Sequence, residues 1–103
     1  MAVGTPLYLS PEIWNSKHYS KAADVWALGI ILHEILTLKH PFASQTKDEL
    51  KRRVCTEPLA RMKNSLISEE LEGLVHQMLQ KDPAQRRIFL KHLMHQSLQL
   101  LTD

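Results

Sequence analysis

Apolar residues recur along this chain at helical spacing, and no segment alternates apolar and polar positions as a half-buried strand does. The longest apolar stretch, residues 22–38, has Ala, Val, Ile, Leu or Trp at twelve of its seventeen positions. Ser20 can cap this helix, which is predicted to run to about Leu38 and to be ended by Pro41. Because no face of the helix is polar, we expect it to be buried on all sides.

Cap residues and breakers predict a second helix in the middle of the chain. Thr46 and Glu49 form a capping box, so the helix begins there, and it continues to about Cys55. Its charges are acidic first and basic last, as the helix dipole prefers. The pair Glu57-Pro58 ends it.

Two more helices are predicted from apolar stripes. Ser68 can cap the third helix, and Asp82-Pro83 stops it because a proline disfavours a helical residue before it. The stripe of the third helix has the spacing i, i+3, i+4, i+7, i+8, at Leu71, Leu74, Val75, Met78 and Leu79. The last helix carries one apolar face, at Leu90, Leu93, Met94, Leu98 and Leu101.

The N-terminal residues 1–19 are loop-like, with Pro6 and Pro11 as breaks and one helical turn at residues 11–14. The chain is therefore predicted to be all-α, a single domain of 103 residues. The helix at residues 20–38 needs apolar partners all round, yet only two other helices have strong stripes. Burying one large aliphatic side chain is worth about 1.5–3 kcal/mol, so we interpret the chain as part of a larger fold.

Composition and charge exclude several classes of function. Apolar residues make up 44% and charged residues 23% of the chain, as in soluble globular proteins. The net charge of +2 is too small to favour nucleic acid, and the basic cluster at residues 51–53 suits a helix C-terminus. Charges interrupt the longest apolar stretch, so we expect no membrane span. Cys55 is the only cysteine, which suits a reducing compartment, and we expect a cytoplasmic protein, with a nuclear or cytoskeletal location as alternatives.

Other chemical motifs are incomplete. His33-Glu34 begins like a zinc-protease motif, but Thr37 stands where the second histidine is needed. His92 and His95 are three apart on a helix, and no third ligand is apparent, so we expect no metal site.

Three motifs in order carry a resemblance to a known family. They are GTPLYLSPE at residues 4–12, DVWALGIILHEI at residues 24–35 and KDPAQRR at residues 81–87. Together they resemble the C-terminal lobe of a eukaryotic Ser/Thr protein kinase, from the end of the activation segment to the last helices. With TLKHPF at residues 37–42, they are most similar to the NIMA-related kinases.

The resemblance implies that the first motif docks the substrate. Thr5 matches the Thr that hydrogen-bonds the catalytic Asp and a neighbouring Lys in Ser/Thr kinases, so the acceptor would be Ser or Thr. Ala2, Pro6 and Leu9 match the pocket for the substrate residue that follows the acceptor.

The resemblance assigns structural roles to five other residues. Glu12 and Arg86 match the partners of a buried ion pair, which suits a planar guanidinium. Trp26 matches the Trp that packs on the proline of the Ser-Pro-Glu motif, here Pro11. Asp24 matches the Asp that accepts hydrogen bonds from the backbone of the catalytic loop, and its place in the most apolar helix implies burial.

The last motif departs from the family pattern. The family has Pro and then Ser or Thr after the Arg matched by Arg86, whereas Arg87 and Ile88 occupy those positions. Arg87 is thus a competing partner for the carboxylate of Glu12. Ile88 cannot cap the last helix, because its side chain has no hydrogen-bonding group. Asp82 is an alternative cap for a short turn, with Gln85 three residues on.

Motifs that the sequence lacks decide the functional interpretation. Phosphoryl transfer needs a Gly-rich loop, a Lys on the phosphates, a catalytic Asp, and an Asp and an Asn for magnesium. Gly-x-Gly-x-x-Gly, Val-Ala-Ile-Lys, His-Arg-Asp and Asp-Phe-Gly do not occur among the 103 residues. We therefore expect a fragment of a Ser/Thr kinase, whose family uses ATP and magnesium and phosphorylates proteins. The fragment is expected to bind neither cofactor and to be inactive alone.

This interpretation treats residues 1–103 as a partial kinase domain. Residues 1–19 would hold the substrate-binding loop and the Ser-Pro-Glu motif, and residues 20–103 the helical subdomain of a complete two-lobed α+β fold. Two alternatives stay open. The chain could be a stand-alone, non-catalytic kinase-like module that binds another kinase or a scaffold, or an unrelated four-helix domain.

Overall fold

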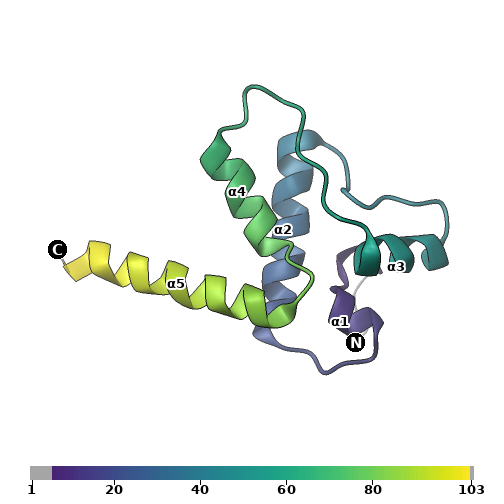
Figure 1. Ribbon diagram of the computed structural model, residues 1–103, viewed down its shortest axis with the longest axis horizontal. Helices are drawn as coiled ribbons and strands as arrows, with labels where there is room; N and C mark the ends of the chain where they lie inside the picture. The colour runs from purple at the N-terminus through teal and green to yellow at the C-terminus, as the bar shows by residue number, and fades with distance from the viewer. Residues whose placement is uncertain (1–5, 103) are drawn as a thin grey trace.

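The computed structural model describes residues 6–102, and every element in that part of the chain is helical. Figure 1 shows α2 upright in the middle, with α4 beside it, α1 and α3 on one side, and α5 leading away on the other. The all-α prediction is confirmed for these residues. The elements are the 3-10 turn η1 (Pro6–Tyr8) and the helices α1 (Pro11–Trp14), α2 (Lys21–Thr37), α3 (Lys47–Thr56), α4 (Glu69–Met78) and α5 (Pro83–Thr102).

The predicted caps set the starts of α3 and α4. The Thr46 hydroxyl accepts the backbone N–H of Glu49 at 3.1 Å, and the Ser68 hydroxyl accepts that of Leu71 at 3.1 Å. The Glu49 carboxylate accepts from the Arg52 side chain instead of closing the capping box. Ser20 occupies the N-cap position of α2 without a side-chain cap bond.

The predicted end of α2, at about Leu38, holds to within one residue, but Pro41 is not what ends the helix. The helix stops at Thr37 because Leu38 takes the left-handed conformation, with φ 63°, and donates its N–H to the carbonyl of Glu34 at 2.7 Å. The break therefore comes before Pro41. A leucine in this conformation is unusual, since a left-handed backbone costs a side-chain-bearing residue about 1–2 kcal/mol.

The core gathers around the stacked rings of Trp26 and Phe42. Their centroids are 6.0 Å apart with 9° between the planes, and both side chains are buried. The ammonium group of Lys81 lies 4.6 Å from the Phe42 ring centroid. Aliphatic side chains from α2, α3 and α4 complete the cluster, at Ile30, Leu50, Val54, Val75 and Leu79.

The prediction that α2 is buried on all sides is wrong for this chain. Leu28 and Ile35 are 56% and 67% exposed, and Ile31 is also exposed. Helices α4 and α5 both pack on α2, and no described segment covers the side that carries these three residues. The shortage of apolar partners inferred from the sequence agrees with this result.

The apolar face predicted for the last helix is exposed along its C-terminal half. Leu93, Met94, Leu98 and Leu101 are all exposed, and Figure 1 shows this half of α5 leading away from the other helices. Helix α5 runs without a break from Pro83 to Thr102. At its start, the Asp82 carboxylate accepts the N–H of Ala84 at 2.9 Å. Asp82 thus caps α5 itself, and no second helix start is needed at Ile88.

A buried ion pair joins α1 to α5. The Arg86 Nη1 donates to Glu12 Oε2 at 3.1 Å, and Nη2 donates to Glu12 Oε1. The Arg86 side chain is 0% exposed and that of Glu12 is 7% exposed. The competing partner, Arg87, is exposed. The pairing is bidentate, as planar guanidinium and carboxylate groups favour.

Backbone carbonyls occupy the remaining donors of Arg86. Its Nε donates to the carbonyl of Gln80 at 2.7 Å, Nη1 also donates to that of Ala22, and Nη2 to that of Lys81 at 3.4 Å. A guanidinium has five N–H donors, and all five are used here. One side chain therefore fixes α1, the first turn of α2 and the connection between α4 and α5.

Gly29 generates the first prediction, because α2 and α4 approach closely there. A Cβ at Gly29 would lie 2.8 Å from Leu79 Cδ2 and 2.9 Å from Met78 Cβ. We expect Gly29→Ala to lower the free energy of unfolding by about 1–3 kcal/mol, measured by urea denaturation. The matched control is Gly73→Ala in α4, where nothing lies within 4 Å; this change should raise stability by about 0.5–1 kcal/mol. Equal effects from both changes would contradict the close packing.

The ion pair generates the second prediction. Arg86→Met leaves the Glu12 carboxylate buried and unpaired, so we expect it to lower the free energy of unfolding by about 3–5 kcal/mol. Arg87→Met removes the same charge from an exposed neighbouring position and should change stability by less than about 0.5 kcal/mol. Where Arg86→Met prevents folding, Glu12→Gln, which keeps the side-chain shape, is the second variant. A small loss equal to that of Arg87→Met would refute the central role of the pair.

Candidate functional site

The candidate site is the segment that leads into α1, here called the docking segment, residues 6–10. Pro6 lies in η1 and Leu9 follows it, and both side chains are half-buried. The Leu9 N–H donates to the carbonyl of Pro6 at 3.3 Å, which makes the segment a tight turn. The other two substrate-binding candidates, Ala2 and Thr5, lie outside the described residues.

Two long-range hydrogen bonds hold the docking segment. The Tyr8 hydroxyl donates to the Glu34 carboxylate of α2 at 3.1 Å. This hydrogen bond raises the pKa of Tyr8, with smaller contributions from burial and from the charge of Glu34. The ring of His40, in the loop after α2, lies with its Nε2 2.7 Å from the carbonyl oxygen of Leu7. The turn is thereby attached both to α2 and to the loop that follows it.

The contacts of His40 identify its tautomer. The backbone N–H of Phe42 donates to Nδ1 of His40 at 3.0 Å, so Nδ1 acts as an acceptor and carries no proton. The other nitrogen, Nε2, then carries the proton and donates to the carbonyl of Leu7. His40 thus satisfies one group on each side of its ring.

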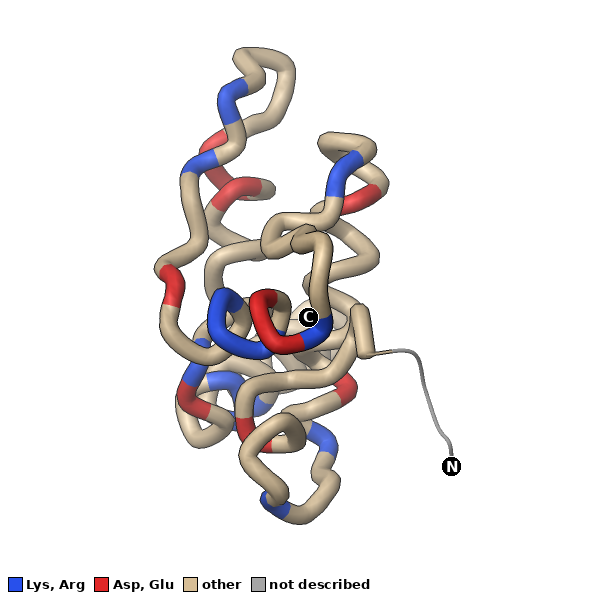
Figure 2. Tube along the Cα trace, turned by 90° about the vertical axis from the view of Figure 1, so that its right-hand side faces the viewer, with Lys and Arg blue, Asp and Glu red and all other residues tan. Residues whose placement is uncertain are grey.

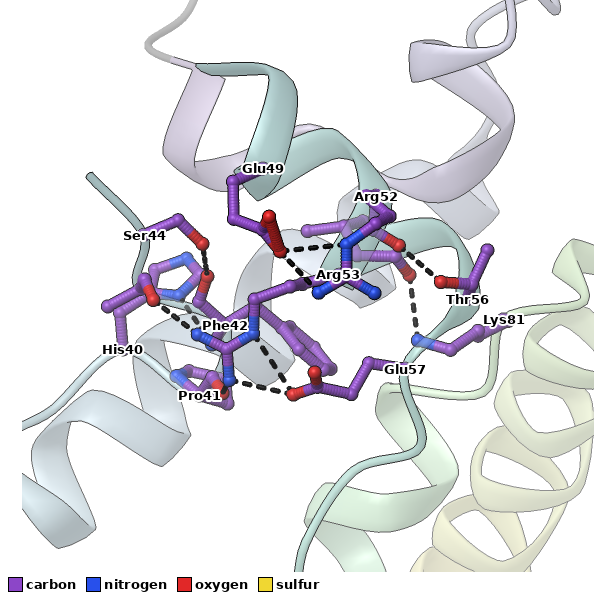
Figure 3. Close-up of polar contacts among 12 residues, drawn as sticks. His40, Pro41, Phe42, Ser44, Glu49, Arg52, Arg53, Thr56, Glu57 and Lys81 are labelled. Carbon is purple, nitrogen blue, oxygen red and sulfur yellow. Dashed lines mark hydrogen bonds and ion pairs between the residues drawn. The ribbon is translucent and has the colours of Figure 1, made fainter. Parts of the chain in front are cut away.

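Helix α3 supports the loop that carries His40, as Figure 3 shows. The Arg53 guanidinium donates to the carbonyl of Ala43 and, at 2.7 Å and 3.0 Å, to the Glu57 carboxylate. The Lys81 ammonium donates to the carbonyl of Val54 at 2.7 Å. These contacts fix α3 against the loop and against the connection between α4 and α5.

The C-terminal end of the docking segment runs directly into the anchored turn α1. Ser10 is the N-cap residue and Pro11 the first helical residue, and both are buried. Glu12 follows at once and binds Arg86. Only two residues separate Leu9 from Glu12, so the ion pair determines where the docking segment ends.

The structure differs from expectation at Asp24 and leaves one contact of Trp26 as a prediction. Asp24 is exposed, and it accepts a hydrogen bond from the Tyr19 hydroxyl. The expectation of burial is wrong because Asp24 lies on a side of α2 that no described segment covers.

Trp26 is fully buried against Phe42, with the Arg86 guanidinium 5.4 Å from its ring centroid. The packing of Trp26 on Pro11 stays a prediction.

The sequence reasoning did not assign Tyr8, Glu34, His40, Arg53 or Lys81 to the site. Four of them stand in the motifs that carry the family resemblance, which contain Tyr8, Glu34, His40 and Lys81. Tyr8 and Glu34 are 26 residues apart, and His40 and Leu7 are 33 apart, so only the folded arrangement identifies these contacts.

No cluster of three or more His, Cys, Asp or Glu within residues 6–102 is arranged to hold a metal ion. Among the same residues, no helix has both the length and the apolar character needed to cross a membrane.

Comparison with known proteins places the chain in a family. The family model described as "Protein kinase domain" matches residues 1–98. Serine/threonine-protein kinase Nek3 of Mus musculus is 43% identical over 84 residues, which cover 82% of this chain and 16% of the relative. Nek5 of Homo sapiens is 40% identical over 84 residues, covering 82% and 12% of the two chains. Serine/threonine-protein kinase ULK3 of Xenopus laevis is 38% identical over 93 residues, covering 89% and 20%.

The chain spans a fifth or less of the length of these relatives. Several of them are NIMA-related kinases, which confirms the resemblance seen in the motifs. The described helices agree with the C-terminal helical lobe of the kinase fold. The chain therefore belongs to the protein kinase family, in its serine/threonine-specific branch.

Proposed function

We propose that this chain is the substrate-docking half of a Ser/Thr protein kinase that transfers the γ-phosphate of ATP to protein Ser or Thr. One observation carries the proposal: the docking segment leads directly into α1, where the carboxylate of Glu12 is buried against Arg86, 74 residues away. A buried charged pair of this kind fixes the position of the segment that a protein substrate would meet. The family match over residues 1–98 supplies the reaction type.

The proposed roles follow the matched positions. Thr5 would orient the acceptor hydroxyl, while Ala2, Pro6 and Leu9 would form the pocket for the next substrate residue. Asp24 would accept hydrogen bonds from the catalytic loop; its exposure in this chain leaves its carboxylate available for such donors.

The nucleotide site lies elsewhere in this proposal. The sequence has three glycines and none of the phosphate-binding or magnesium-binding motifs, so these residues do not fit ATP or Mg2+. Both would be bound by residues outside this chain, and the 103 residues alone would not transfer phosphate. The single cysteine agrees with a reducing, cytoplasmic setting.

A second candidate function is a stand-alone, non-catalytic module that binds another kinase or a scaffold. The exposed apolar residues Leu28, Ile31 and Ile35 on α2 favour it, since a partner could cover them. In the first proposal, the same residues would be covered by the rest of a kinase domain.

The proposal predicts that this chain can replace its counterpart in a relative. We expect a chimera of mouse Nek3, in which residues of this chain substitute for the aligned segment, to phosphorylate Ser and Thr peptides and not Tyr peptides. In the chimera, Thr5→Ala should lower kcat/KM by about 100-fold, because small misplacements of reacting groups are costly. Thr56→Ala is the matched control, since Thr56 bonds only to the nearby carbonyl of Arg52. Initial rates with radiolabelled ATP give both values.

Two results would contradict the proposal. One is a chimera that folds, as judged by its thermal transition, yet transfers no phosphate. The other is the 103-residue chain, assayed alone with ATP and Mg2+, phosphorylating peptides at a rate that Thr5→Ala lowers.

A further inference from the structure

A cavity of about 530 Å3 lies at the C-terminal end of α2. The C-terminal end of α2 and the loop after it form one part of its wall, and the connection between α3 and α4 forms the other. Figure 1 shows these segments at the same end of the molecule. The cavity shares only His40 with the contacts that hold the docking segment.

The wall of this cavity is basic. Its described lining includes Lys39, Arg61 and Lys63, and none of the described lining residues is Asp or Glu. Arg61 already pairs with Glu69 at 2.9 Å. Lys39 and Lys63 are exposed, and neither forms an ion pair within residues 6–102. Figure 2 marks basic positions on both segments at this end.

Nearby titratable groups leave the charge of the cavity to these two lysines. His33 has its Nδ1 3.1 Å from the carbonyl oxygen of Lys39, and burial lowers the pKa of His33, so the ring stays neutral near pH 7. The ring of His40 is engaged by the N–H of Phe42 and the carbonyl of Leu7. The carboxylate of Glu72 accepts the N–H of Met62 at 3.1 Å and contacts His76 at 2.9 Å. Glu72 is buried and is not among the residues that line the cavity.

Apolar side chains complete the wall. Leu36, Leu59 and Met62 line the cavity, and Leu38 at its rim is 88% exposed. Leu38 is also the residue held in the left-handed conformation, so its side chain is presented at a position that the backbone fixes. An occupant thus meets two separated positive charges with an aliphatic surface between them.

We propose that this cavity binds an acidic segment of a partner protein, with Asp or Glu carboxylates on Lys39 and Lys63 and an aliphatic side chain against Leu38. A carboxylate-bearing peptide fits the combination of positive charge and apolar wall. The inference goes beyond the proposed function, because such binding needs neither ATP nor phosphoryl transfer.

The test is a fluorescence-anisotropy titration of the purified chain. The probe is a fluorescein-labelled nonapeptide with the sequence Asp-Glu-Leu repeated three times, compared with the matched Asn-Gln-Leu peptide. We expect the acidic peptide to bind at least about tenfold more tightly, and Lys39→Glu with Lys63→Glu to remove that preference. Lys51→Glu with Lys91→Glu changes the net charge equally at exposed positions on α3 and α5 and should alter affinity less than about twofold.

A second measurement, with a peptide of opposite charge, keeps the test informative if the Lys39→Glu, Lys63→Glu variant is destabilised. The Lys39→Glu, Lys63→Glu variant should bind a Lys-Lys-Leu repeat peptide more tightly than the unchanged chain does, which a misfolded protein would not. The proposal is overturned if the acidic and amide peptides bind alike, or if both double variants weaken binding equally. It is also overturned if only a phosphoserine peptide, or only phosphatidylserine vesicles, bind in a way that depends on Lys39 and Lys63.

Discussion

The buried pair of Glu12 and Arg86 is the contact on which the rest of this structure depends. Removing two charges from water is costly, and the cost is offset only when every donor finds an acceptor in good geometry. Arg86 meets this condition with the carboxylate and the carbonyls of Ala22, Gln80 and Lys81. Small movements of any of these segments would leave a buried donor without a partner, so the pair specifies one arrangement of them.

The position of the docking segment follows from this arrangement in steps. Glu12 fixes α1, and α1 fixes the C-terminal end of the docking segment. Tyr8 and His40 then hold its middle against α2 and the following loop. The loop is itself held by Arg53 of α3. The docking segment is thus held in place by side chains that lie outside it.

Local signals predicted the helices well, and the ion pair followed from the family motifs. Thr46 and Ser68 mark helix starts because a hydroxyl in that position satisfies a free backbone N–H, whatever the rest of the fold. The left-handed conformation of Leu38, which ends α2 before Pro41, was not predictable, because a left-handed leucine has no local sequence signal.

Burial was harder to predict than secondary structure. Leu28 and Leu98 belong to apolar patterns that are typical of core positions, yet both are exposed. An apolar stripe indicates that a face is suited to burial, and only the other segments present decide whether it is covered. The same limit applies to Asp24, which is exposed although its helix is the most apolar of the chain. Contacts such as that of His40 with Leu7 depend on the fold as a whole, so a linear pattern does not contain them.

The 74-residue separation of Glu12 and Arg86 has a consequence for how the protein is made. A chain leaves the ribosome from its N-terminus at about 5–20 residues per second, so Glu12 emerges roughly 4–15 seconds before its partner. During that interval the carboxylate has no guanidinium to bind and remains in water. The ion pair that positions α1 can therefore form only after most of the described helices have been synthesised.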